Sequence, residues 1–334
     1  MSSSLPSVST SICVLGMHRS GTSALAGLLS MLGVEFGRNL MKPGDDNPKG
    51  FYEHNEIVGC HVSMLEALES YYDDILPLPA GWEKRRETIM HREHLRRLIF
   101  NEFAGKPLWG FKDPRVCRLL PMWFPLFDEL GTAAKFVLMV RNPDEIARSM
   151  CVRGGHSYNQ ILLVALQHML EFERHTRGRP RVVVSFDGLM ADWRRELDRV
   201  ARVLDVRLPV QMAANDPRVS VFLDPALRHH VGAASAETAV AMRGADPRFA
   251  EWVYKAYETL LASATDSVAI NETTLDGLGK NLKDHLLNLA AWRPPRLNKD
   301  RITKMQLHAS RLDGENQRLQ RELQDLRRKL GQQF

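Results

Sequence analysis

The sequence lacks several features that mark whole classes of protein. Cysteine is scarce, with four in 334 residues and no CxxC pair. Such wide spacing favours neither a zinc site nor a disulfide framework and is typical of a reducing cytoplasm. No apolar run approaches the roughly 18 to 20 residues that a membrane-spanning helix needs. Residues 1–10 contain no Lys or Arg, unlike a secretory signal. We therefore expect a cytoplasmic protein with no membrane span.

The excess of positive charge is confined to the C-terminal end. The whole chain has 45 Lys and Arg against 40 Asp and Glu, but the last 42 residues alone hold 11 against 5. The rest is close to neutral, so we expect no general nucleic-acid-binding surface. With 44% hydrophobic and 25% charged residues, the composition is that of a globular protein and excludes a mostly disordered chain.

Short β-branched runs alternate with longer amphipathic segments along most of the chain. Such alternation predicts an α/β fold, a three-layer P-loop-like domain with a mainly parallel sheet, over residues 10–265. The expected strands are residues 12–15, 108–111, 135–140 and 181–186, and the expected helices include residues 23–32, 145–150, 159–174 and 193–204.

The C-terminal segment has a different pattern. Residues 266–295 are expected to form a linker and a short helix, and residues 296–334 a coiled-coil tail. One polar core position, Asn316, among leucines favours a parallel two-stranded coil and a homodimer through residues 302–330. A helix folded back on the domain, or another partner, stays open. The repeat consists of Ile302, Met305, Ala309, Leu312, Asn316, Leu319, Leu323, Leu326 and Leu330.

A turn after the first expected strand is the most specific local signal. Its sequence, G-M-H-R-S-G-T-S, occupies residues 16–23, directly before the first expected helix. Small residues at a helix N-terminus present backbone N–H groups to an anion, and the helix dipole adds positive potential. A tight turn that binds nothing is the alternative. The candidate binding residues are His18, Arg19, Ser20, Gly21, Thr22 and Ser23.

A second candidate phosphate site follows the third expected strand. There, Arg141 and Pro143 precede Ser149. An arginine at a strand end and a serine in the next helix could converge on one phosphate, although a turn with a solvated arginine has the same pattern. The first turn is similar to a Walker A loop, but Thr22 stands at its lysine position, which disfavours a P-loop kinase or NTPase.

Together the two motifs resemble the nucleotide-binding signature of sulfotransferases that use 3′-phosphoadenosine-5′-phosphosulfate (PAPS). In that family a loop ending in S-G-T-[ST] holds the 5′-phosphosulfate, and R-x-P-x-x-x-x-x-S holds the 3′-phosphate. Residues 186–189 are similar to the family's later Y-E-D-L element. The resemblance covers roughly residues 11–204, and the forms G-M-H-R-S-G-T-S and F-K-D-P-R look like its bacterial and Golgi-type branch. It implies PAPS as co-substrate and no metal.

The resemblance also implies roles in catalysis. Lys112, in F-K-D-P-R, is expected to stabilise the transferring sulfonate together with Arg19, and Asp113 is a candidate for orienting the lysine. Family members use a histidine near the second strand or a glutamate after the first helix as base. The chain has no histidine next to Lys112 in sequence, so Glu53 is the expected base. Glu56, His54 and Glu35 remain alternatives for this role.

The expected activity is transfer of the PAPS sulfonate to a hydroxyl of a small molecule or glycan, above all a glycan or lipid-linked sugar. Two other functions remain open: a P-loop nucleotide kinase or NTPase, and a catalytically inactive nucleotide-binding coiled-coil scaffold. The cluster Arg228, His229 and His230 could contact a phosphate or an anionic acceptor, or could cap a helix. The sequence leaves the acceptor itself undetermined.

Overall fold

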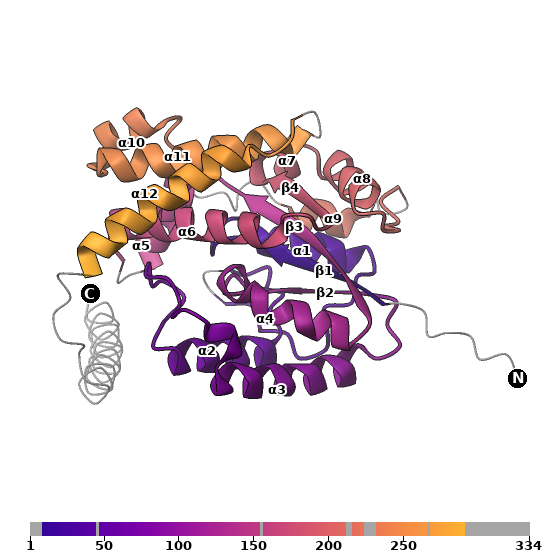
Figure 1. The fold of residues 1–334 in the computed structure, drawn as a ribbon. Helices are drawn as coiled ribbons and strands as arrows, with labels where there is room; N and C mark the ends of the chain where they lie inside the picture. The colour runs from indigo at the N-terminus through magenta and orange to yellow at the C-terminus, as the bar shows by residue number, and fades with distance from the viewer. Residues whose placement is uncertain are drawn as a thin grey trace, which may run out of the picture. The chain divides into compact units, whose positions relative to one another are not determined.

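A four-stranded parallel sheet forms the centre of the protein in a computed structural model (Figure 1). The structure describes residues 9–44, 47–153, 156–211, 216–223, 232–265 and 268–290. The strand order is β2-β1-β3-β4, so β1 and β3 are central. The strands are β1 (Ser9–Leu15), β2 (Leu108–Lys112), β3 (Thr132–Val140) and β4 (Arg181–Ser185).

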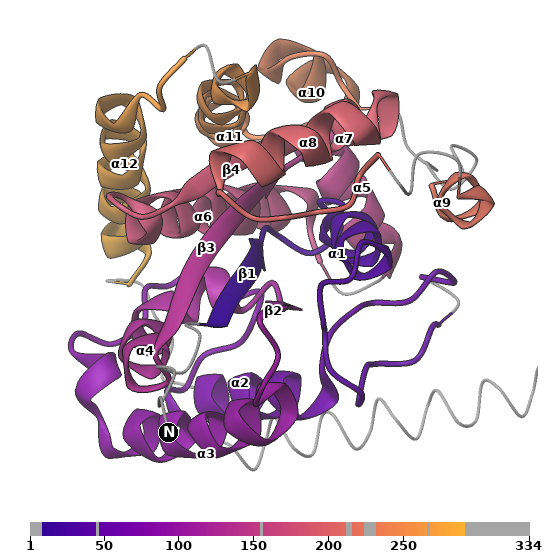
Figure 2. The ribbon, with the colours of Figure 1, turned by 90° about the vertical axis from the view of Figure 1, so that its right-hand side faces the viewer.

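Helices cover both faces of the sheet, which makes three layers. Because side chains alternate along a strand, Ile12, Val14 and Met139 pack on one face with helix α1. Phe136 and Leu138 have the opposite parity and are also fully buried, on the face that α4 and α6 cover. Figure 2 shows α1 on one side of β1 and β3, with α4 and α6 on the other. Burial on both faces explains the nearly continuous apolar strands.

The helices occupy most of the chain between the strands. Helix α6 carries the longest apolar run of the sequence and is buried along most of its length. The helices are α1 (Thr22–Met31), α2 (Asn55–Ala67), α3 (Arg86–Phe103), α4 (Val116–Glu129), α5 (Pro143–Arg153), α6 (Tyr158–Thr176), α7 (Phe186–Ala191), α8 (Trp193–Val203), α9 (Pro217–Phe222), α10 (Ala236–Arg243), α11 (Pro247–Ala262) and α12 (Glu272–Ala290), with 3-10 turns η1 (Trp82–Lys84) and η3 (Ser263–Thr265).

The α/β architecture with a parallel sheet and helices on both sides is confirmed, and each expected strand and helix overlaps an observed one. Residues 266–295, expected to form a linker and a short helix, contain α12. Its Leu275 and Leu282 are buried, and its Asp276 pairs with Arg177 at 2.9 Å. The first compact unit therefore runs to Asp284, and the second comprises His285–Phe334. The coiled coil expected at residues 302–330 lies outside the described residues.

None of the helices within the described ranges is both long and apolar enough to cross a membrane.

Truncating a core side chain of β3 should destabilise the domain strongly. Leu138 is fully buried between its strand neighbours Leu15 and Val183. Leu138→Ala removes buried methyl groups and leaves a cavity, so we expect a loss of about 2–5 kcal/mol in the free energy of unfolding. Urea denaturation monitored by circular dichroism measures it. Met242→Ala, at a side chain that is 60% exposed, is the control and should change this free energy by less than about 0.5 kcal/mol. Equal losses in both variants would contradict the assignment of this core.

Candidate active site

The parallel register brings three chain segments to one edge of the sheet. Val14 of β1 pairs with Lys112 of β2, and Leu15 pairs with Leu138 of β3. The turn after β1, the end of β2 and Arg141 after β3 therefore lie together, as ligand-binding groups do at the carboxyl edge of open α/β sheets. They line one pocket with residues 47–51 and parts of α7 and α9.

The turn after β1 is built to present amide groups. Ser20 donates twice to the carbonyl oxygen of Met17, from its N–H at 3.2 Å and its hydroxyl at 2.6 Å, so it braces the turn rather than lining the pocket. Gly21 has φ +94°, and it is the N-cap of α1 with no side-chain cap bond. The first-turn N–H groups of α1 are therefore open to an anion, with the helix dipole behind them.

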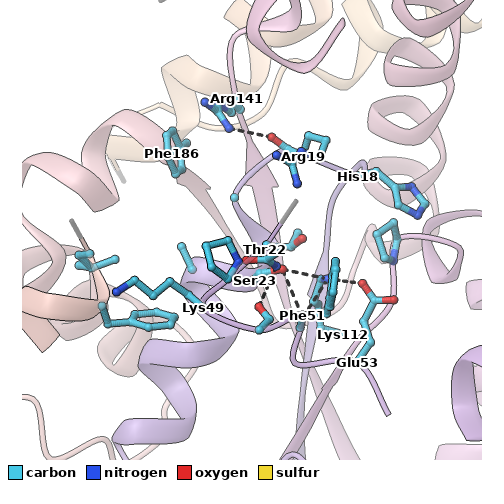
Figure 3. A pocket seen from close by; sticks show the side chains of 18 of the residues that line it. His18, Arg19, Thr22, Ser23, Lys49, Phe51, Glu53, Lys112, Arg141 and Phe186 are labelled. Atoms are coloured by element: carbon cyan, nitrogen blue, oxygen red, sulfur yellow. Dashed lines mark hydrogen bonds and ion pairs between the residues drawn. The ribbon is translucent and has the colours of Figure 1, made fainter. Parts of the chain in front are cut away.

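A cationic end of the pocket forms where this turn meets α5. Arg141 donates from Nη1 to the carbonyl oxygen of Arg19 at 2.9 Å, and Arg19 donates from Nε to Ser149 Oγ at 2.8 Å. Glu145 accepts from Arg141 Nε at 2.7 Å, and the Phe186 ring lies 4.1 Å from the Arg141 guanidinium. Arg19, Arg141 and Ser149 are thus brought together by these two bonds. Figure 3 shows Arg19 beside Arg141.

Lys112 occupies the other end of the pocket, at the end of β2. Its side chain is 3% exposed, and its ammonium donates to Ser23 Oγ at 3.2 Å, to the carbonyl oxygen of Phe51 at 3.1 Å and to Glu53. Three donors thus meet three acceptors, which a buried ammonium requires. In Figure 3, Thr22 and Ser23 lie between this end and Arg141.

Of the four candidate bases, Glu53 is the one that contacts Lys112. Its side chain is 7% exposed, and its Oε1 pairs with the ammonium. The other three make contacts elsewhere. Glu56 accepts from Asn39 at 3.1 Å, the buried His54 lies 3.9 Å from Glu102, and Glu35 pairs with Lys106 at 3.3 Å.

Asp113 does not orient Lys112, contrary to the sequence-based expectation. Its Oδ2 accepts from His61 Nδ1 at 2.8 Å, and its Oδ1 accepts from the Arg115 guanidinium at 2.8 Å. Asp113 follows the last residue of β2, so its side chain points away from Lys112, toward α2 and the start of α4. Glu53, Ser23 and Phe51 take the orienting role instead.

One histidine shares the pocket with Lys112, although none is adjacent to it in sequence. His18 lines the pocket, and its ring lies 4.9 Å from that of Tyr72. Burial, with the nearby Arg115, lowers the pKa of His18 well below its usual value, so its imidazole is neutral. Sequence reasoning missed this proximity because the contact joins segments far apart in the chain.

Several pocket residues carry no recognisable sequence signal. Lys49 donates to the carbonyl oxygen of Val221 at 2.9 Å and lines the pocket with Phe222, and Phe51 contributes its carbonyl oxygen. Phe186 could have been found, since the aromatic position of the Y-E-D-L-like element is the one that meets Arg141. The expected cluster Arg228, His229 and His230 lies outside the described residues.

The arrangement suits a ligand with two anionic groups. The α1 N-terminus and Lys112 could receive one such group, and Arg19 and Arg141 the other. Over the described part of the chain, no group of three or more His, Cys, Asp or Glu could hold a metal ion.

A model of the Sulfotransferase family matches residues 11–209, more than half of the chain. The chain belongs to the sulfotransferase family. The match includes both ends of the pocket, from Arg19 to Lys112 and Arg141. No curated protein matches this sulfotransferase.

Three solved structures of sulfotransferases are similar to this chain. The sulfotransferase domain of a Synechococcus olefin synthase is 18% identical, with 82% of this chain and 95% of that one covered and a TM-score of 0.39. STF1 from Mycobacterium tuberculosis is 15% identical, with 75% and 77% covered and a TM-score of 0.39. A sulfotransferase domain from the curacin biosynthetic pathway is 14% identical, with 84% and 99% covered and a TM-score of 0.34.

A methyl group at Gly21 should disrupt the anion-binding turn. A Cβ there would lie 2.4 Å from the Phe186 ring, at φ +94°. Gly33 has a similar φ of +89° with nothing within 4 Å of a Cβ, so Gly33→Ala measures backbone strain alone. We expect Gly21→Ala to lower the melting temperature by several degrees more than Gly33→Ala, since overpacking adds about 1–3 kcal/mol. Equal shifts in calorimetry would contradict the packing of the turn against Phe186.

Proposed function

We propose that this sulfotransferase moves the sulfonate of PAPS to an acceptor hydroxyl and releases 3′,5′-ADP. The observation that carries the proposal is the position of Lys112. One ammonium contacts both Ser23, at the start of α1, and Glu53, a nearly buried carboxylate. A group transferred at this point would have a cation, a helix N-terminus and a base around it.

The two cationic ends support a donor with two separate anionic parts. In this proposal the turn at residues 18–23 and Lys112 hold the 5′-phosphosulfate. Arg19, Arg141 and Ser149 hold the 3′-phosphate, and the guanidinium fork of Arg141 is suited to a bidentate phosphate contact. Phe186 keeps Arg141 in place through its ring face.

The proposed reaction is an in-line displacement at sulfur. The acceptor oxygen forms a bond to sulfur while the bond between sulfur and the 5′-phosphate oxygen breaks. Glu53 takes the proton of the acceptor hydroxyl, and Lys112 stabilises the charge that develops on the sulfonate and the bridging oxygen. Arg19 neutralises the leaving nucleotide. Positioning and electrostatics supply the rate, as in phosphoryl transfer.

We further propose a glycan or lipid-linked sugar as acceptor, in the cytoplasm, and a homodimer through residues 302–330. The acceptor proposal rests on the hydroxyl chemistry of the family, and the dimer on the heptad pattern alone.

Binding of 3′,5′-ADP should stabilise the protein without added metal. Ligand that binds only the native state adds about 2.7 kcal/mol at a hundred times its dissociation constant. We expect a rise in melting temperature for the wild type that Arg141→Gln abolishes. Arg179→Gln is the matched control, because its guanidinium also lies over a ring, 3.7 Å from Phe124, outside the pocket. A response to Mg·ATP but not to 3′,5′-ADP would overturn the proposal in favour of a kinase.

Removing either charge of the Lys112–Glu53 pair should lower the turnover number strongly. We expect Lys112→Gln and Glu53→Gln each to lower kcat for formation of 3′,5′-ADP from PAPS by about 10² to 10³, the usual effect of one such group. Each single variant should also lose stability because it leaves a buried charge unpaired. The double variant should regain stability but not activity. Lys106→Gln, at a lysine 45% exposed, is the control. Activity above a tenth of wild type in the single variants would exclude these roles.

A further inference from the structure

A chain of buried hydrogen bonds leads from the core to Arg115, whose guanidinium forms an ion pair with Glu53. Trp123 donates from its indole N–H to His61 Nε2 at 3.0 Å, and His61 Nδ1 bonds to Asp113 Oδ2 at 2.8 Å. Asp113 accepts from Arg115 Nη1 at 2.8 Å, and the same nitrogen lies 3.8 Å from Glu53 Oε2. Trp123, His61 and Asp113 are fully buried.

The donor roles along this chain follow from the first link. An indole N–H can only donate, so His61 Nε2 must accept. A neutral imidazole that accepts at Nε2 carries its proton at Nδ1 and donates it to Asp113. Asp113 is therefore the negative member. Burial acts to raise its pKa, but Arg115 and His61 outweigh burial and hold that pKa well below its usual range.

Arg115 is fixed by this chain more firmly than the local turn requires. Asp113 Oδ1 already accepts from the backbone N–H of Arg115 at 3.0 Å, which fixes the turn before α4. The additional bond to Nη1 aims the guanidinium, which lies 5.8 Å from the Tyr72 ring and is only 14% exposed. Although burial opposes the charged form, Asp113 and Glu53 raise the pKa of Arg115, so it remains a cation.

Each oxygen of Glu53 thus faces a different cation. Oε1 bonds to Lys112, and Oε2 lies 3.8 Å from Arg115, beyond hydrogen-bond distance. Oε2 therefore keeps a lone pair for an incoming proton, while the two cations set the plane of the carboxylate.

We propose that Arg115 is a positioning residue for the base Glu53, held in place by Trp123, His61 and Asp113. The inference rests on the proposed function, in which Glu53 accepts the proton of the acceptor. Arg115 acts through Glu53 and does not itself line the donor pocket. Its loss should therefore change proton transfer and leave donor binding intact.

The test is the pH dependence of 3′,5′-ADP release from PAPS with water as acceptor. A carboxylate that loses a neighbouring cation takes up its proton at higher pH, so activity on the acid side is lost earlier. We expect Arg115→Gln to lower kcat about tenfold and to move the acid limb up by about one pH unit, with KM for PAPS changed less than about twofold. Arg115→Lys keeps the positive charge, so the acid limb of this variant should return most of the way to its wild-type pH.

Two further variants keep the inference falsifiable. Asp113→Asn keeps an acceptor for the Arg115 N–H but weakens the hold on its guanidinium, and it should move the acid limb in the same direction by less. Arg92→Gln is the control, because Arg92 is 27% exposed and lies on α3, 3.7 Å from Glu129. Stabilisation by 3′,5′-ADP verifies that each variant is folded.

The outcomes separate this inference from the proposed function. A wild type that binds 3′,5′-ADP but never forms it from PAPS, with water or with any of a set of sugar and glycan hydroxyl acceptors, would remove the proposed function and this inference with it. If the wild type is active and the acid limbs of Arg115→Gln and Asp113→Asn coincide with the wild-type limb, the positioning role of Arg115 is overturned, but the proposed function is not. A change confined to KM for PAPS would also overturn it, because Arg115 would then bind the donor.

Discussion

The site depends on the parallel pairing of β1 with β2 and β3. This pairing places the ends of the three strands at one edge, so the turn at residues 16–21, Lys112 and Arg141 meet although the turn and Arg141 are about 120 residues apart in the sequence. In a parallel sheet the register decides which ends meet, and a shift would turn Lys112 to the other face. Burial of both sheet faces enforces the register, because any slip would expose apolar residues or bury charged ones.

Charge burial at this edge explains why so many polar groups are tied together. Lys112, Glu53 and Asp113 are almost fully buried, and each would be strongly destabilising without a partner. Pairing offsets the desolvation cost but seldom yields net stability. The groups are therefore better understood as a prearranged electrostatic environment, which is what the proposed reaction needs to stabilise charge in its transition state without reorganisation. The same logic applies to Arg141, placed between Glu145 and Phe186.

Local patterns were sufficient for the strands and for the turn between β1 and α1, and the family resemblance linked that turn with Arg141 and Ser149, which the structure brings together. These features depend on short-range chemistry: β-branched runs, a glycine at positive φ, and an arginine at a strand end. The prediction that Asp113 orients Lys112 was wrong. Side chains alternate in direction along the chain, so Asp113 points away from Lys112, toward His61 and Arg115. His61, Tyr72 and Lys49 were missed because each reaches the site by folding of a loop or helix from elsewhere.

The sequence by itself determined the α/β class and the order of the strands along the chain, since these follow from periodicity, and its motifs pointed to Arg19, Lys112 and Arg141, which line one pocket. Tertiary structure alone decided that Glu53, rather than Glu56, His54 or Glu35, meets Lys112. It also decided that Asp113 faces His61 and Arg115. The physical reason is that hydrogen bonds and ion pairs between distant segments depend on how helices pack on the sheet, and no local pattern encodes that packing.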